Sequence, residues 1–201
     1  MSLRLRLASW WVPRPILARE LDRVAQVTTA ALDALLEAHV PQATGEISSQ
    51  SLLKGGSLEE WRAAMATAHA SRVAALVGAL GREEAVRLGR QALFQVGWCL
   101  GQEVRGRLGV SDRLVDLLQA ARVLYRILGI HFQVQWLGEG RALLTVHRCA
   151  LAQYYSEAAC LILSAADEGV VRGLNPQAAM AFEARMTGGT PVCSAGLALE
   201  G

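Results

Sequence analysis

The sequence has almost no lysine, no closely spaced cysteine pair and no apolar run long enough to cross a membrane. Lys54 is the only lysine, and the 20 basic residues against 18 acidic ones give a formal net charge of +2. No basic stripe interleaves with aromatic residues, so we expect no nucleic-acid partner. The longest apolar stretches, such as 73–80, fall short of the ~20 residues that a membrane-spanning helix needs, so no membrane span is expected.

The four cysteines lack CxxC spacing and do not form the pattern of a secreted disulfide framework. Segment 1–15 is positively charged and contains two tryptophans, but it lacks the apolar run and small-residue cleavage site of a signal peptide. We therefore expect a reduced, cytoplasmic setting. Abundant arginine, alanine, leucine and glycine suggest a bacterial source.

The first two thirds of the chain have the apolar periodicity of helices. With 52% hydrophobic residues among 201, the chain can bury the core of one integrated domain. Segment 1–12 is expected to be irregular, with Trp10 and Trp11 packed on the body, and 41–56 is expected to be a loop. Apolar residues recurring at three- and four-residue steps predict helices over 16–39, 57–80, 83–107 and 111–128.

Two local features refine these helices. Ser57 and Glu60 have the spacing of a capping box, which predicts that the second helix begins at Ser57. Gly89, Gly97 and Gly101 are costly inside the third helix, so they predict the close approach of a neighbouring element or of a ligand.

From residue 131 the period of the apolar pattern changes from 3.6 to 2. Alternating segments predict strands, and Ser156 followed by Glu157 predicts the start of a helix between two strand pairs. The predicted fold class is α+β: an N-terminal four-helix layer over 1–129, followed at 130–201 by a cysteine-bearing ββαββ unit with a four-stranded antiparallel sheet.

Three cysteines, Cys149, Cys160 and Cys193, fall at or near junctions between these elements. A helix that begins at Ser156 leaves Cys149 in a position to fold back towards Cys160, whereas one straight helix from Cys149 would hold the two about 16 Å apart. Thiolates bind zinc or iron–sulfur clusters and also act as nucleophiles. His147 is the candidate fourth ligand. The alternative is three buried small side chains and a histidine that is simply hydrogen-bonded.

The predicted helix at 156–172 carries Glu157, Cys160, Ser164 and Asp167 at steps of three, four and three, so they form one stripe. A thiol, a hydroxyl and a carboxylate on one covered face would suit a small-molecule site, with Asp167 as general base or hydrogen-bonding group. The alternative is a solvated face.

The segments HRCALAQYY, AACLILSAADEGVVRGLNP and AFEARMTGGTPVCSAGLAL, together with the helical GREEAVRLGRQALFQVGWCLGQEVRG, resemble the L-2-amino-thiazoline-4-carboxylic acid hydrolase-like family. The resemblance implies hydrolytic opening of a small cyclic amidine thioether and nominates the three cysteines together with Asp167. Gly189 and Thr190 stand where the family has an acidic residue in the final turn. The C-terminal part is also similar to V4R small-molecule-binding domains.

These observations leave three hypotheses open. The first is a hydrolase acting on a non-peptide C–N bond, with Cys160 and Asp167 as catalytic residues, or with a metal ion held by Cys149, Cys160, Cys193 and His147. The second is a non-catalytic module that binds a metal ion, an iron–sulfur cluster or a small molecule, with the glycine-rich third helix as the far wall of its site. The third is a structural protein whose apolar helices form a homodimer.

Overall fold

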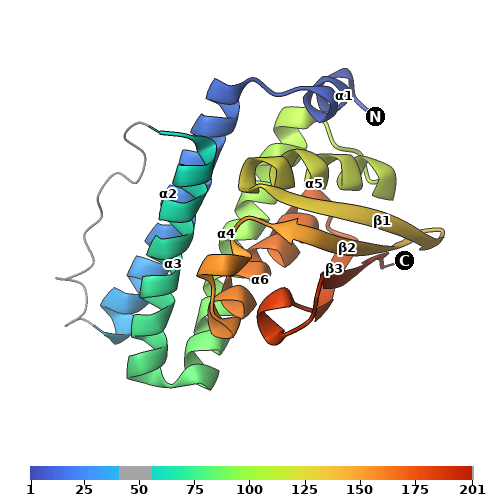
Figure 1. Ribbon diagram of the computed structural model, residues 1–201. Helices are drawn as coiled ribbons and strands as arrows, with labels where there is room; N and C mark the ends of the chain where they lie inside the picture. The colour runs from blue at the N-terminus through green and yellow to red at the C-terminus, as the bar shows by residue number, and fades with distance from the viewer. Residues whose placement is uncertain (41–55, 201) are drawn as a thin grey trace.

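The computed structural model describes residues 1–40 and 56–200 (Figure 1). The predicted loop at 41–56 lies outside these residues except for its last position. The described elements are α1 (Leu3–Trp10), α2 (Arg14–His39), α3 (Leu58–Leu80), α4 (Arg82–Leu108), α5 (Leu114–Leu128), β1 (Ile130–Gly138), β2 (Arg141–Cys149), the 3-10 turn η2 (Ala152–Tyr154), α6 (Glu157–Leu174), β3 (Ala178–Ala184), the 3-10 turn η3 (Met186–Gly188) and β4 (Cys193–Leu199).

The predicted α+β architecture is confirmed. The four strands form one antiparallel sheet in the order β1-β2-β4-β3, so one strand of each hairpin, β2 and β4, lies in its centre beside the other. Helices α5 and α6 pack against the sheet, and α2 and α3 lie together on the far flank (Figure 1). The largest hydrophobic cluster lies between α5, α6 and the inner face of the sheet.

Side-chain caps explain where α3 and α6 begin. The side chain of Ser57 accepts a hydrogen bond from the Glu60 amide, and the Glu60 carboxylate accepts one from the Ser57 amide, which is the predicted capping box. Ser156 caps α6 by accepting from Ala159. Helix α5 begins three residues later than predicted: its N-cap is Arg113, and the hydroxyl of Ser111 donates to the Asp116 carboxylate at 2.8 Å.

Helices α4 and α6 touch backbone to backbone along a seam of glycines. A Cβ atom on Gly97 would overlap the carbonyl oxygen of Ala166, and one on Gly169 would overlap the carbonyl oxygen of Phe94. The glycines of α4 therefore serve the approach of a neighbouring helix, which was one of the two predicted alternatives. The seam fixes α6 in place, and α6 carries one wall of the site described below.

The N-terminal segment differs from the sequence prediction. Residues Leu3–Trp10 form a helix instead of an irregular segment, and its Ser2 N-cap accepts from the Leu5 amide. Leu5 is buried against α5, but Trp10 and Trp11 are exposed and do not pack on the body. The periodicity failed here because apolar residues lie on both faces of a helix only two turns long.

Helix α3 is long and apolar enough to cross a membrane when judged by length and composition alone. The core helix of a globular protein passes the same test, and here α3 packs between α2, α4 and α6. It buries two polar side chains, His69 and Arg72, and the Arg72 guanidinium pairs with Asp33 at 2.6 Å. One face of α3 therefore packs into the protein, while only 33% of its apolar window is buried.

Candidate ligand cavity

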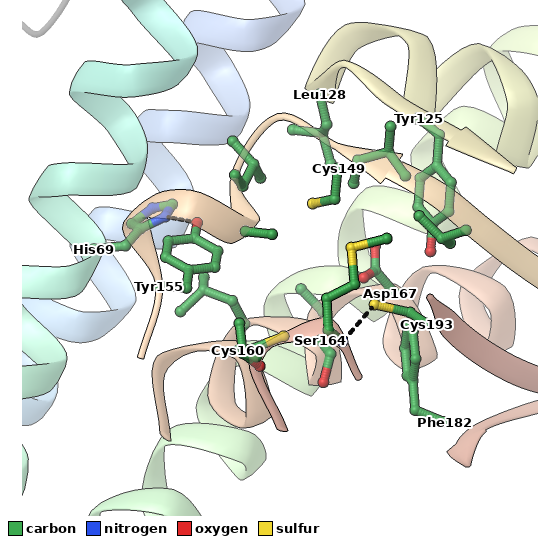
Figure 2. A pocket seen from close by; sticks show the side chains of 18 of the residues that line it. His69, Tyr125, Leu128, Cys149, Tyr155, Cys160, Ser164, Asp167, Phe182 and Cys193 are labelled. Carbon is green, nitrogen blue, oxygen red and sulfur yellow. Dashed lines mark hydrogen bonds between the residues drawn. The ribbon is translucent and has the colours of Figure 1, made fainter. Parts of the chain in front are cut away.

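A cavity of about 110 Å³ lies between α2, α3, α5, α6 and the inner face of the sheet. Most of its wall is aliphatic, aromatic or sulfur-bearing, and the polar side chains on it come from different elements and point into the same space (Figure 2). Its polar and sulfur-bearing lining residues are Thr28, Met65, His69, Tyr125, Cys149, Tyr155, Cys160, Ser164, Asp167, Met186, Thr187 and Cys193.

The three predicted cysteines all line this cavity. Cys149 ends β2, Cys160 lies in the first turns of α6, and Cys193 begins β4 with its side chain on the packed face, as alternation predicts. The turn η2 separates Cys149 from α6, so the helix does begin after the Ser156 cap and Cys149 does fold back. Figure 2 shows their sulfur atoms around one space.

His147 does not join them, and its predicted position as a fourth ligand is wrong. The register of β1 and β2 pairs Phe132 with Val146 and His131 with Arg148, which leaves His147 as the extra residue of a β-bulge. The bulge breaks the alternation, so His147 is exposed while Val146 and Cys149 both face the cavity.

The thiols of Cys149 and Cys160 are held in their neutral form. Burial raises the pKa of Cys149 to about 11, although the backbone amides of Leu151 and Ala152 donate hydrogen bonds to its sulfur. Burial also raises the pKa of Cys160, against a smaller opposite effect of the Thr187 hydroxyl. Nucleophiles and metal ligands are thiolates, so this apolar surrounding works against both roles.

Of the described residues that line the cavity, Asp167 is the one that has a carboxylate. Asp167 has intermediate exposure and lines the cavity, and burial raises its pKa from 3.8 to about 7. The neighbouring charge of Glu168 adds to this, whereas a hydrogen bond from the Tyr125 hydroxyl and the charge of Arg185 lower the pKa. Asp167 is therefore a buried acid that changes its charge near neutral pH.

A second polar group on the wall consists of Thr28, His69 and Tyr155. The Thr28 hydroxyl has one proton, which it donates to the Val24 carbonyl at 2.6 Å, so Nε2 of His69 must donate to Thr28 across 2.8 Å. Nδ1 of His69 then accepts from the Tyr155 hydroxyl at 2.9 Å (Figure 2). Burial lowers the pKa of His69 to about 3, so the ring is neutral.

Sequence reasoning missed His69, Thr28 and Tyr125. His69 had a usable signal, because it lies among the apolar residues of one face of α3, four positions from both Met65 and Val73. The predicted far wall is also wrong: α2 and α3 close the cavity, whereas the glycine seam of α4 packs on the opposite side of α6.

A second cavity of about 80 Å³ adjoins the first, between α2, α4, α5, α6 and the sheet. The two have a common wall, formed by Val24, Thr28, Tyr125, Leu128, Ala166 and Asp167. Asp167 and Tyr125 thus stand at the boundary between two apolar spaces.

Comparison with known proteins finds similar solved structures, whereas the two sequence comparisons find no match. No family model matches the sequence, and no curated protein matches it. Among solved structures, the chain is similar to a trafficking protein particle complex subunit 3 from Naegleria fowleri, which was determined covalently bound to palmitic acid. Sequence identity is 16%, the TM-score is 0.47, and the match covers 68% of this chain and 95% of that chain.

The predicted hydrolase and the predicted metal or iron–sulfur protein are both wrong. A hydrolase of the predicted kind needs Cys160 as a thiolate, but burial raises the pKa of Cys160 and works against that form. Within residues 1–40 and 56–200, no group of three or more His, Cys, Asp and Glu side chains is placed to hold a metal ion. The described cysteines are free thiols, so neither a disulfide nor a ligating cluster is present among them. The resemblance to the hydrolase-like family stays a prediction.

Proposed function

We propose that this protein binds a small, largely apolar molecule whose single polar group is a hydrogen-bond donor directed at Asp167. The observation that carries the proposal is a buried carboxylate on the wall of a predominantly apolar cavity. A buried acid with one protein partner, Tyr125, has capacity left to accept a further hydrogen bond.

Size limits the ligand. A cavity of about 150 Å³ holds benzene, and the two adjoining cavities of about 110 and 80 Å³ together offer space of that order. The ligand is therefore a single ring or a short branched chain, unless the wall moves. An anionic head group is disfavoured, because Asp167 is ionised above about pH 7.

The experiment compares three probes of nearly equal size: phenol, toluene and benzoate. We expect phenol to raise the melting temperature of the protein in a dose-dependent way, toluene to do so less, and benzoate to have no effect. Isothermal titration calorimetry at about pH 8, where Asp167 is ionised, then measures the affinities. Failure of both phenol and toluene to bind at millimolar concentration would overturn the proposal.

Two variants of α2 localise the binding. Val24 lines both cavities, so Val24→Phe fills the space that the ligand would occupy and should abolish phenol binding. Val27 lies on the same helix but lines an outer groove against α4, so Val27→Phe is the matched control and should bind phenol as the unmodified chain does. Equal loss of binding in both variants would place the probe elsewhere.

A further inference from the structure

Exposed large apolar side chains gather at the N-terminal end of the chain. Six of the ten on the described surface belong to the first sixteen residues, and they are Met1, Leu3, Leu7, Trp10, Trp11 and Ile16. Single exposed apolar residues are ordinary, but six within sixteen residues, two of them tryptophans, mark an interaction surface. These residues belong to α1, the connection after it and the start of α2, which lie at one end of the molecule (Figure 1).

Helix α1 presents this group in an ordered way. At 3.6 residues per turn, Leu3, Leu7 and Trp10 fall within about 60° of the helix circumference. They are 71%, 57% and 84% exposed, whereas Leu5 on the opposite side is 0% exposed. The outward face of α1 is therefore an apolar stripe that the protein itself does not cover.

The exposure of the stripe does not come from a loose terminus. Leu5 packs into the main hydrophobic cluster, and the hydroxyl of Ser2 donates to the carbonyl oxygen of Leu108 at the end of α4. The guanidinium of Arg126 on α5 donates to the carbonyl oxygen of Ser9 at 2.8 Å. Both ends of α1 are thus tied to the body, and the stripe is held facing outward.

Arginines flank the stripe without acidic neighbours in sequence. Arg4 and Arg6 lie on either side of it on the helical projection, and Arg14 and Arg19 follow on α2. The chain has no Asp or Glu before Glu20, and no ion pair is described for any of these four arginines among residues 1–40 and 56–200. The surface is both apolar and positively charged.

We propose that α1 and the start of α2 bind the surface of a membrane that contains anionic phospholipids. Helices that lie in a membrane interface have tryptophan and leucine on one face and arginine or lysine beside it, which is the arrangement of α1. Tryptophan is suited to the depth of the head groups because its ring is apolar and its indole N–H is polar. The four arginines complement the negative lipid charge.

A second copy of the chain fits the same surface poorly. A two-fold symmetric interface brings the same patch of both subunits together. It would place Arg4 and Arg6 of one copy against those of the other, with no acidic residue in the segment to neutralise them. Charge complementarity therefore favours the lipid surface over a homodimer at this patch.

Vesicle flotation tests the proposal with the full-length chain. The vesicles contain equal parts of phosphatidylglycerol and phosphatidylcholine, and pure phosphatidylcholine vesicles are the comparison. We expect the unmodified chain to float with the anionic vesicles much more than with the neutral ones. The double variant Trp10→Ala/Trp11→Ala should lower the partition coefficient by roughly tenfold or more, since both side chains lose apolar contact with lipid. Arg4→Gln/Arg6→Gln should lower it roughly thirtyfold on anionic vesicles.

Trp136→Ala is the matched control, because Trp136 is a 52% exposed tryptophan on β1, outside this surface, and its loss should leave flotation unchanged. Circular dichroism checks that each variant is folded. If the Trp10→Ala/Trp11→Ala variant does not fold, Leu3→Gln/Leu7→Gln is used in its place. Equal flotation with neutral and anionic vesicles would overturn the proposal. So would light scattering that shows a dimer dissociated by Trp10→Ala/Trp11→Ala together with an absence of flotation, which would assign the surface to a second copy.

Discussion

Replacing Asp167 by asparagine should stabilise the protein at alkaline pH and leave its stability nearly unchanged in acid. Burial raises the pKa of Asp167 from 3.8 to about 7. Between these two values the folded chain holds a proton that the unfolded chain has released, so the free energy of unfolding falls as the pH rises. Below the lower value both states are protonated, and the carboxyl group imposes no penalty.

The magnitude follows from the same shift. Each pKa unit corresponds to about 1.4 kcal/mol, so ionised Asp167 costs the folded state as much as about 4 kcal/mol at alkaline pH. The asparagine side chain would stay neutral, and its carbonyl oxygen can still accept the hydrogen bond of Tyr125. We therefore expect the free energy of unfolding of the Asp167→Asn variant to exceed that of the unmodified chain by up to that amount at about pH 8. At about pH 4 the two free energies should be equal.

Urea unfolding at the two pH values, followed by circular dichroism, measures the difference. Asp116→Asn is the control of opposite sign. Burial raises the pKa of Asp116, but hydrogen bonds from Ser111 and from the α-amino group of Met1 outweigh this and lower it. Its stabilising effect is present above pH 3.8 and is lost as the pH falls, so Asp116→Asn should destabilise the protein at about pH 8. The reasoning about Asp167 fails if Asp167→Asn destabilises the protein more at alkaline than at acid pH.

Three further predictions concern packing, the buried histidine and thiol reactivity. Gly97→Ala should lower the free energy of unfolding by about 3 kcal/mol, because its Cβ meets the α6 backbone. Gly78→Ala, with nothing nearby, should raise it by about 0.5–1 kcal/mol in the same urea titration. Tyr155→Phe removes the hydroxyl that donates to Nδ1 of buried His69. The variant should therefore have a lower melting temperature and a free energy of unfolding lower by about 1–3 kcal/mol. Iodoacetamide should modify exposed Cys99 far faster than Cys149, whose raised pKa keeps it a thiol; equal rates on peptide mapping would contradict this.

Local signals in the sequence were sufficient for most of the architecture. Ser57 with Glu60, and Ser156, mark helix starts through hydrogen bonds between residues three apart, so a pattern of single residues predicts them. The predicted start of α6 at Ser156 implied that the segment after Cys149 is not part of the helix. In the structure this segment contains η2, and Cys149 lies beside the cavity. Interactions within one or two turns are readable without the fold.

The errors arose where distant segments decide the outcome. The bulge at His147 is a property of pairing with β1, and no feature of β2 alone reveals it. His69 receives its two partners from positions 41 and 86 residues away, so its role depends on packing. The metal hypothesis treated the cysteines by residue type, whereas the apolar wall around Cys149 decides that it stays protonated.

The glycine seam between α4 and α6 determines which part of the cavity can yield. Because Gly97 and Gly169 bring the two backbones into contact, α6 cannot shift without separating a long, continuous interface. Another part of the cavity wall comes from η2 and η3, each of which is a single 3-10 turn. Entry and exit of a ligand should therefore proceed by displacement of these turns, and hydrogen exchange in them should be faster than in α6. In this respect α6 is the fixed part of the cavity wall, and η2 and η3 are the parts expected to move.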